Sequence, residues 1–282
     1  MSLPAELPRL IATDLDGTLL RDDKTVSPRT VAALAAAEAA GVEVIFVTGR
    51  PARWMDVVSA HVHGHGIAIC GNGAAVVDLH RGGAFVETRP LRPENALDIA
   101  AAVRAAAPGA VFAVERTTGF HHEPDYPPLE FEPAFQVAPV ERLLADEGDD
   151  HAASPVLKLL AFHPALDPDA FLALARTVTG GHGEVTRSSP TALLEISAPG
   201  VSKASTLARR CARRGIAPGE VVAFGDMPND LDMLGWAGTA YAMANAHPAV
   251  LAATARRTAS NEEDGVARVI EGLLAEHGAT VS

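Results

Sequence analysis

The sequence predicts an α/β protein in which a Rossmann-like parallel-sheet core domain carries an inserted α+β domain. In the first and last thirds of the chain, short apolar runs alternate with alanine-rich segments of helical length. The middle of the chain is instead rich in proline and acidic residues, and its strand-like pieces are fewer. Apolar runs separated by helices are typical of parallel strands that are covered on both faces.

Composition sets the broad class of protein. The chain has 282 residues, of which 48% are hydrophobic, and this is enough for two domains with cores of their own. No apolar run approaches the roughly 20 residues of a membrane span, and the N-terminus lacks the pattern of a secretory signal. Two cysteines exclude a disulfide framework, and a net charge of −12 disfavours nucleic acid as a partner. We therefore expect a cytoplasmic protein that binds neither a membrane nor a nucleic acid.

The first third of the chain contains three predicted strands and two predicted helices. Ser27 is a typical helix N-cap, Pro28 suits the first helical position, and Gly41 suits the position just after a helix. These three residues bound a helix that connects the first strand to the second. In chain order the predicted elements are a strand, a helix, a strand, a short helix and a strand, at residues 10–14, 29–40, 42–47, 52–60 and 67–70.

The last third repeats this alternation. Its predicted elements are a strand, a helix, two strands and a final helix, at residues 193–196, 203–214, 221–224, 239–243 and 265–276. Asp14, Thr48 and Asp226 each lie at the end of a predicted strand. Ligands of open α/β sheets bind beyond the carboxyl ends of the strands. We therefore expect these three side chains to converge on one crevice.

The middle of the chain predicts a separate α+β domain. Strand-like and helix-like pieces occur there without regular alternation, at residues 93–104, 111–114, 156–162 and 169–178. The expected boundaries are 1–83 for the first part of the core, 84–188 for the inserted domain and 189–282 for the second part of the core.

Asp14 and Asp16 lie one residue apart behind an apolar run that begins at Leu10. Two carboxylates this close repel each other unless a cation lies between or beside them. A solvent-exposed turn could tolerate both charges, but it would not need a buried segment before it. The pair therefore indicates a bound cation, a chemical task, or both.

Four motifs resemble those of the haloacid dehalogenase superfamily of phosphatases. They are DLDGT at 14–18, VTGR at 47–50, Lys203 within GVSKASTL, and GDMPND at 225–230, and their order and spacing match the family. A weaker similarity is Asn72-Gly73-Ala74. Any one motif is a modest signal, whereas four in order are specific. The insertion resembles the α+β cap of the Cof-type (class IIB) branch.

This resemblance implies a phosphoryl-transfer site that uses Mg²⁺. Asp14 would attack phosphorus and form an aspartyl phosphate, and Asp16 would protonate the leaving oxygen and later activate water. Lys203 would place a compact positive charge beside the transferred group. The implied catalytic residues are Asp14, Asp16, Thr48 and Lys203. The implied substrate-binding residues are Thr48, Gly49, Arg50, Lys203 and Asn229, and the implied metal-binding residues are Asp14, Asp16, Asp226 and Asp230.

Some of these roles carry alternatives. Asp16 would reach the metal through its backbone carbonyl group, and Asp230 would either bind a metal-bound water or hold Lys203. Arg50 could face the substrate or could be a charge at the start of a helix. Gly225 is expected to let the backbone turn sharply between the strand and the site.

The function expected from these residues is Mg²⁺-dependent hydrolysis of small phosphorylated metabolites, with sugar phosphates among the candidates. One alternative is a phosphotransferase or phosphomutase, which would pass the phosphoryl group to another hydroxyl. A second alternative is a non-catalytic sensor of a phosphorylated ligand, although an intact Asp16 argues against it.

Two histidine-containing stretches raise a further possibility. FHHEPDY at 120–126 falls in the insertion, and we expect His121, His122 or Glu123 to affect substrate preference through hydrogen bonds. The alternative is that they are ordinary loop residues. His61, His63 and His65 alternate in a predicted loop and are interpreted as surface residues.

Overall fold

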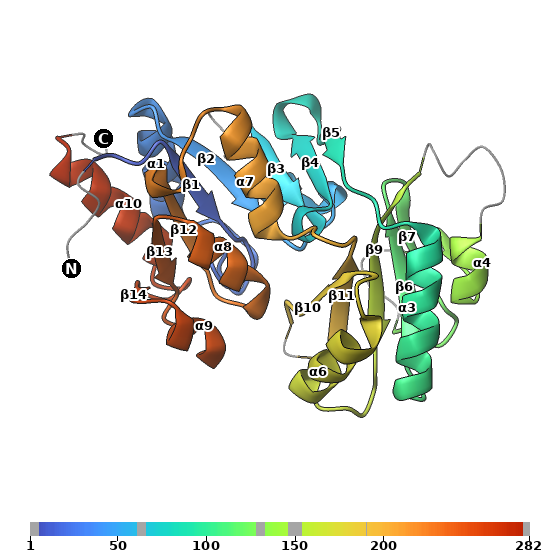
Figure 1. Ribbon diagram of the computed structural model, residues 1–282. Coiled ribbons are helices and arrows are strands. Elements are labelled where there is room, and N and C mark those ends of the chain that lie inside the picture. Colours follow the sequence, from blue (N-terminus) through green and yellow to red (C-terminus); the bar gives the residue numbers. More distant parts are fainter. Residues whose placement is uncertain (1–5, 61–65, 128–132, 146–153, 190, 279–282) are drawn as a thin grey trace. The chain divides into compact units, whose positions relative to one another are not determined.

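The computed structural model describes residues 6–60, 66–127, 133–145, 154–189 and 191–278. The chain forms two compact units, each of which is described by itself (Figure 1). The core unit comprises residues 1–87 and 203–282, and the inserted unit comprises residues 88–202. The sequence predicts an insertion at 84–188, so both predicted boundaries differ from those of the compact unit.

An eight-stranded sheet with the order β14-β13-β12-β1-β2-β3-β4-β5 forms the centre of the core unit. Strand β1 lies between β2 and β12 and runs parallel to both. All four residues of β1 are buried, as its apolar sequence predicts. The strands are β1 (Leu10–Thr13), β2 (Glu43–Val47), β3 (Ile67–Cys70), β4 (Ala75–Asp78), β5 (Ala84–Thr88), β12 (Val221–Gly225), β13 (Thr239–Ala242) and β14 (Arg256–Arg257).

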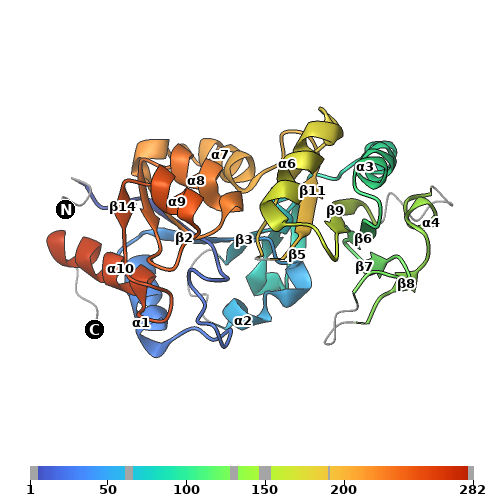
Figure 2. The same ribbon diagram turned by 90° about the horizontal axis from the view of Figure 1, so that it is seen from below.

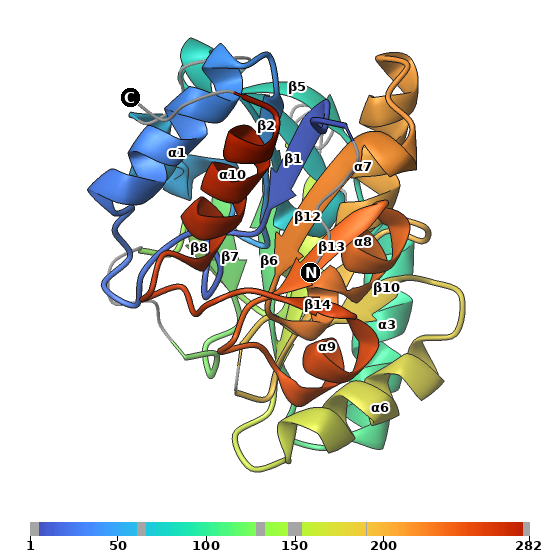
Figure 3. The ribbon, with the colours of Figure 1, turned by 90° about the vertical axis from the view of Figure 1, so that its left-hand side faces the viewer.

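Helices cover both faces of this sheet. Figure 3 shows α1 and α10 together on one side of the sheet and α7 and α8 on the other. Ser27 caps α1 because its hydroxyl accepts a hydrogen bond from the Thr30 amide at 3.0 Å, and Pro28 takes the first helical position. The helices are α1 (Pro28–Ala39), α2 (Asp56–Ser59), α7 (Lys203–Arg213), α8 (Leu231–Trp236), α9 (Pro248–Ala253) and α10 (Gly265–Glu276). The 3₁₀ turns are η1 (Ala52–Trp54), η2 (Gly71–Gly73), η3 (Leu79–Arg81), η4 (Pro218–Glu220) and η5 (Pro228–Asp230).

One edge of the sheet departs from the predicted parallel pattern. Strand β4 runs antiparallel to β3, and β5 continues this edge of the sheet. The reversal occurs in η2, where Asn72 takes a left-handed backbone conformation with φ 55°. Asparagine and glycine adopt left-handed backbone conformations more readily than other residues. The sequence Gly71-Asn72-Gly73 therefore permits a tight turn that the strand-and-helix pattern did not reveal.

The inserted unit contains a second sheet, of six strands, with the order β10-β11-β9-β6-β7-β8. Neighbouring strands are antiparallel except for β7 and β8. Its strands are β6 (Val111–Arg116), β7 (Gly119–His122), β8 (Gln136–Val137), β9 (Val156–Phe162), β10 (Glu184–Thr186) and β11 (Leu193–Ser197). Helices α3 (Pro93–Ala106) and α6 (Pro168–Thr179) lie on one face of this sheet (Figure 2), and α4 (Val140–Leu144) packs beside α3.

Strand β11 (Leu193–Ser197) lies in the inserted unit, whereas the sequence predicts residues 193–196 as a strand of the core. It pairs with β9 and β10 in the sheet of the inserted unit. Glu195 interrupts the apolar run of β11 and is buried, and the Lys158 ammonium of β9 lies 2.6 Å from its carboxylate. Periodicity predicts that a segment is a strand, but it does not identify the sheet that the strand joins. Within the described residues, no helix combines the length and the apolar composition that a membrane crossing requires.

Candidate active site

The carboxyl ends of three neighbouring strands bring the main sequence motifs together. Asp14 follows β1, Thr48 follows β2 and Asp226 follows β12. The register aligns the last residue of β1 with Phe46 of β2 and Phe224 of β12, and the Asp14 amide donates to the Phe224 carbonyl at 3.1 Å. Side chains from distant parts of the sequence therefore meet at the carboxyl ends of β1, β2 and β12.

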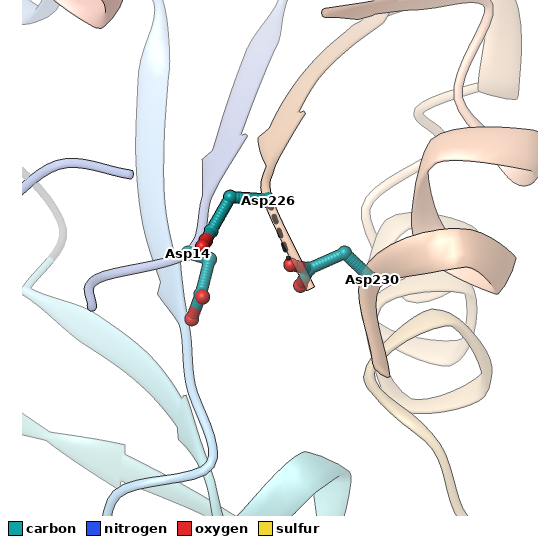
Figure 4. A group of neighbouring side chains, drawn as sticks. All are labelled: Asp14, Asp226 and Asp230. Atoms are coloured by element: carbon teal, nitrogen blue, oxygen red, sulfur yellow. Dashed lines mark hydrogen bonds between the residues drawn. The ribbon is translucent and has the colours of Figure 1, made fainter. Parts of the chain in front are cut away.

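Three buried carboxylates form the centre of this arrangement (Figure 4). One oxygen from each of Asp14, Asp226 and Asp230 lies within 4.8 Å of the others. The Thr18 hydroxyl donates to Asp226 Oδ1 at 2.7 Å and fixes its orientation. Gly17 has φ 74°, and a Cβ atom there would lie only 2.3 Å from Asp226 Oδ2. The glycine of the DLDGT motif is thus required for the close approach of the Asp226 carboxylate.

Lys203 inserts one positive charge among these carboxylates. It is the first residue of α7, and its Nζ lies 2.8 Å from Asp14 Oδ1 and 2.7 Å from Asp230 Oδ1. Burial alone would lower the pKa of this ammonium group, but the two carboxylates outweigh burial and raise it. Lys203 therefore stays charged at any physiological pH.

The charge of the carboxylate cluster is not balanced by Lys203 alone. Burial, opposed by Lys203 and reinforced by Asp230 and Asp226, raises the pKa of Asp14 well above its usual value. Burial and the neighbouring Asp230 also raise the pKa of Asp226, to about 7. Hard carboxylate oxygens in this number and spacing suit a divalent cation such as Mg²⁺. The residues present therefore fit a metal ion, which would lower the cost of keeping the carboxylates ionised.

Asp230 organises the loop that carries Asp226. Its Oδ2 accepts hydrogen bonds from the Asp226 and Met227 amides, both at 3.0 Å, while its Oδ1 binds Lys203. The contact with Lys203 matches one of the two roles expected for Asp230, and the binding of a metal-bound water stays a prediction. Glycine is needed at position 225 for a different reason from the one expected. The backbone of Gly225 does not take the left-handed conformation of a tight turn. A Cβ atom on Gly225 would lie 2.6 Å from Asp230 Cβ, so the loop requires the missing side chain.

The carboxylate of Asp16 lies outside the three-carboxylate group and binds two cations. Arg50 Nε donates to Asp16 Oδ2 at 2.6 Å and Arg50 Nη2 donates to Oδ1 at 2.7 Å, and Lys24 Nζ lies 3.0 Å from Oδ1. Partial burial would raise the pKa of Asp16, but the hydrogen bonds and charges of Arg50 and Lys24 outweigh it and lower the pKa. Arg50 is therefore more than a charge at a helix start.

The remaining predicted residues lie in the loops that follow the carboxyl ends of β2 and β12. Thr48 is buried, its hydroxyl accepts a hydrogen bond from the Arg50 amide at 3.1 Å, and Gly49 lies between them in the chain. Asn229 is also buried, and its amide group donates to the Asn72 side chain at 3.0 Å. This hydrogen bond joins the loop after β3 to the loop after β12.

Sequence reasoning missed two contributors to the site. Thr18 belongs to a quoted motif, but its hydrogen bond to Asp226 was not anticipated. The motifs assign no role to Lys24, although lysine accounts for only three of the 23 basic residues, at positions 24, 158 and 203. That rarity was the one available signal for Lys24.

The FHHEPDY stretch divides between two faces of the inserted unit's sheet. Glu123 is structural, because its carboxylate accepts hydrogen bonds from Arg104 and from the Phe112 and Val140 amides. His122 lies on the opposite face, with its ring 5.7 Å from that of Phe120. The hydrogen bonds of Glu123 indicate a structural role for this residue, and its expected effect on substrate preference stays a prediction. His61, His63 and His65 lie outside the described residues.

Comparison with known proteins identifies the family. A family model described as haloacid dehalogenase-like hydrolase matches residues 11–270. The chain belongs to the haloacid dehalogenase-like hydrolases. It is 31% identical to the Bacillus subtilis 5-amino-6-(5-phospho-D-ribitylamino)uracil phosphatase YitU, over 94% of this chain and 97% of that protein. It is also 31% identical to the Escherichia coli pyridoxal phosphate phosphatase YbhA, over 94% of this chain and 98% of that protein. The chain is therefore an enzyme of the phosphatase class within this family.

Solved structures agree with the fold. A haloacid dehalogenase-like hydrolase from B. subtilis superposes with a TM-score of 0.79 at 24% identity, covering 94% of this chain and 100% of that one. The subclass IIB sugar phosphatase BT4131 superposes with a TM-score of 0.75 at 21% identity, covering 96% and 99% of the two chains. The fold that the sequence predicts, an α/β core with an inserted α+β domain, is confirmed, and the resemblance of the insertion to the class IIB cap is a resemblance of fold.

Proposed function

We propose that this phosphatase hydrolyses small phosphate monoesters through a covalent aspartyl phosphate on Asp14, with Mg²⁺ as its metal. The observation that carries this proposal is the position of Lys203. Its ammonium group joins the buried Asp14 and Asp230 at the carboxyl ends of the central strands, within the same cluster as Asp226. A fixed cation beside a buried carboxylate suits attack on a phosphate dianion, which would otherwise repel the carboxylate.

The first half of the reaction forms the covalent intermediate. One Asp14 oxygen forms a bond to phosphorus, and the bond from phosphorus to the leaving oxygen breaks. For this step Asp16 must be protonated, although Arg50 and Lys24 favour its carboxylate form in the free enzyme; it then gives its proton to that oxygen, and the product leaves as an alcohol. Thr48, Gly49, Arg50 and Lys203 contact the transferred phosphoryl group, and Asn229 holds the loop of Asp226 beside it.

The second half restores the enzyme. Asp16, now a carboxylate, takes a proton from water, and the water oxygen bonds to phosphorus while the bond to Asp14 breaks. Inorganic phosphate is released. In the structure Asp16 is paired with Arg50 and Lys24, which favours the carboxylate form that this step needs.

The residues that would hold the metal are Asp14, Asp226 and the backbone carbonyl group of Asp16, with Asp230 next to them. When bound, Mg²⁺ would neutralise part of the phosphate charge and stabilise the charge that develops during transfer. Asp230 contributes mainly by fixing Lys203 and the Asp226 loop, since both of its oxygens already accept hydrogen bonds.

The substrate proposed is a small phosphorylated metabolite. Relatives of this chain are named for a phosphoribityl pyrimidine and for pyridoxal phosphate, and a structural neighbour is named a sugar phosphatase. We therefore propose a phosphate ester of a polyhydroxylated or heterocyclic compound. Such metabolites are intracellular, and a cytoplasmic location belongs to the same proposal.

The test is a screen of the Mg²⁺-loaded protein against phosphorylated metabolites, with Asp14→Asn as the control. We expect phosphate release from at least one metabolite and a loss of several orders of magnitude in Asp14→Asn. Transfer of the phosphoryl group to an added alcohol in preference to water would favour a phosphotransferase. Binding of phosphorylated ligands without turnover of any of them would favour a sensor and contradict the proposal.

A further inference from the structure

We propose that Lys24 is a positioning residue that holds the carboxylate of Asp16 in place during the reaction. This inference rests on the proposed function, because it concerns the acid and base of that mechanism. Lys24 Nζ lies 3.0 Å from Asp16 Oδ1. None of the four motifs includes Lys24, which lies eight residues after Asp16.

The contacts of Asp16 show why a second cation is needed. Arg50 binds both oxygens of Asp16, but Arg50 is also proposed to contact the phosphoryl group of the substrate. A guanidinium that turns toward a phosphoryl group releases part of its contact with the carboxylate. Lys24 binds Oδ1 from a different segment of the chain, so it keeps Asp16 oriented while Arg50 engages the substrate.

A turn with several internal hydrogen bonds presents the Lys24 side chain. The Arg21 amide donates to the Thr25 carbonyl at 3.0 Å, and the Lys24 amide donates to the Arg21 carbonyl at 2.9 Å. Asp23 Oδ1 accepts from both the amide and the hydroxyl of Thr25. The turn is thus closed by its own hydrogen bonds.

The same turn is fastened to the segment before α10. Asn261 donates from its side chain to the Leu20 carbonyl and to Asp22 Oδ1, both at 3.0 Å. Glu262 accepts from the Asp22 amide at 2.7 Å. These contacts brace the turn from a second part of the core unit, so the position of Lys24 does not depend on its own ion pair.

Lys24 occupies this position at a conformational cost. Its φ of 67° lies in the left-handed region, where asparagine and glycine are favoured over lysine. Strained residues of this kind are concentrated at functional sites. In a chain with three lysines, a lysine at a position better suited to asparagine indicates a requirement for its charge.

Stability does not explain the pair. The Lys24 side chain is 56% exposed and the Asp16 side chain is 39% exposed. Ion pairs this open to solvent contribute little to folding, and strain in the backbone offsets that contribution. The remaining explanation is the orientation of Asp16.

The experiment compares four variants on two substrates, the best metabolite found and p-nitrophenyl phosphate. Lys24→Ala should lower kcat on the metabolite about tenfold with KM changed less than about twofold, because Lys24 acts through Asp16. The loss on p-nitrophenyl phosphate should be smaller, since its leaving group needs less protonation. Lys24→Arg should restore most of kcat. Arg9→Ala, which removes another exposed cation paired at 3.4 Å with Glu220, should leave kcat unchanged.

Lys24→Asn separates charge from strain. It lacks the charge but suits the backbone, so it should be as slow as Lys24→Ala and melt about 2 °C higher than that variant. Equal melting temperatures for Lys24→Asn and Lys24→Ala would contradict the claim that the backbone is strained at position 24. A Lys24→Asn variant as fast as wild type would contradict the role of the Lys24 charge. If Lys24→Ala changed KM alone, or left kcat unchanged, the proposal for Lys24 would be overturned. The proposed function would still stand in that case if the wild-type enzyme turned over its substrate and Asp14→Asn did not.

Discussion

Replacing Lys203 by methionine tests the buried charge cluster most severely. Methionine keeps much of the side-chain volume but removes the ammonium group that lies 2.8 Å from Asp14 and 2.7 Å from Asp230. All three side chains are buried, and Lys203 is only 1% exposed. Water therefore does not replace the lost contacts without a rearrangement.

The structure sets the expected size of the effect. Breaking a buried ion pair by removing one partner typically costs about 3–5 kcal/mol. The low end of this range applies here, because the raised pKa of Asp14 lets it take up a proton and Asp230 keeps two backbone donors. We expect a loss of about 3 kcal/mol in the free energy of unfolding of the metal-free protein. Turnover should fall by about 10²–10³-fold, as when a fixed electrostatic donor is removed from an active site.

The two tryptophans provide the readout. Trp54 and Trp236 both lie in the core unit, so their fluorescence during urea unfolding follows the unit that contains Lys203. The double variant Lys203→Met/Asp14→Asn removes one of the two carboxylates that lose a partner, and it should recover about 1–2 kcal/mol of the loss. A Lys203→Met protein with wild-type unfolding free energy, or with more than about a tenth of wild-type turnover, would refute the reasoning.

Three further predictions follow from individual contacts. Gly225→Ala places a Cβ atom 2.6 Å from Asp230 Cβ, so it should displace the loop and lower kcat about a hundredfold, whereas a variant with normal kcat would refute the steric argument. Because the pKa of Asp226 is raised to about 7, the folded metal-free protein keeps a proton that the unfolded chain loses above about pH 4. The stability that this bound proton contributes therefore falls as the pH rises toward 7. The increase in melting temperature caused by Mg²⁺ should then be larger at pH 8 than at pH 6, and scanning fluorimetry at both pH values checks this prediction. His122→Ala should change the ratio of kcat/KM for the metabolite to kcat/KM for p-nitrophenyl phosphate, whereas Glu123→Gln should lower stability and leave that ratio unchanged.

The sequence predicted the core of the site because local patterns determine it. Strand β1 is a buried apolar run, Ser27 caps the next helix, and the four motifs each follow a predicted strand or begin a helix. Parallel strands present their carboxyl ends at one edge, so the convergence of Asp14, Thr48 and Asp226 follows from topology. These features require no knowledge of distant contacts.

The features that sequence reasoning missed depend on partners far away in the chain. Strand β11 pairs with β9 and β10 in the inserted unit, and apolar periodicity shows neither this pairing nor the buried contact between Glu195 and Lys158. Glu123 is structural because Arg104 of α3 reaches it. Lys24 faces Asp16 only through a left-handed turn, and its basic charge alone gives no indication of that geometry.

The covalent intermediate provides the most direct test of the mechanism. Mg²⁺-loaded enzyme is mixed rapidly with its best substrate, quenched in acid within one turnover, digested and analysed by mass spectrometry. The account predicts a phosphoryl group on the peptide that contains Asp14, its absence in Asp14→Asn, and its accumulation in Asp16→Asn, where hydrolysis of the intermediate is slow. A phosphoryl group on another residue, or full-speed phosphate release with Asp14 never modified, would contradict the account.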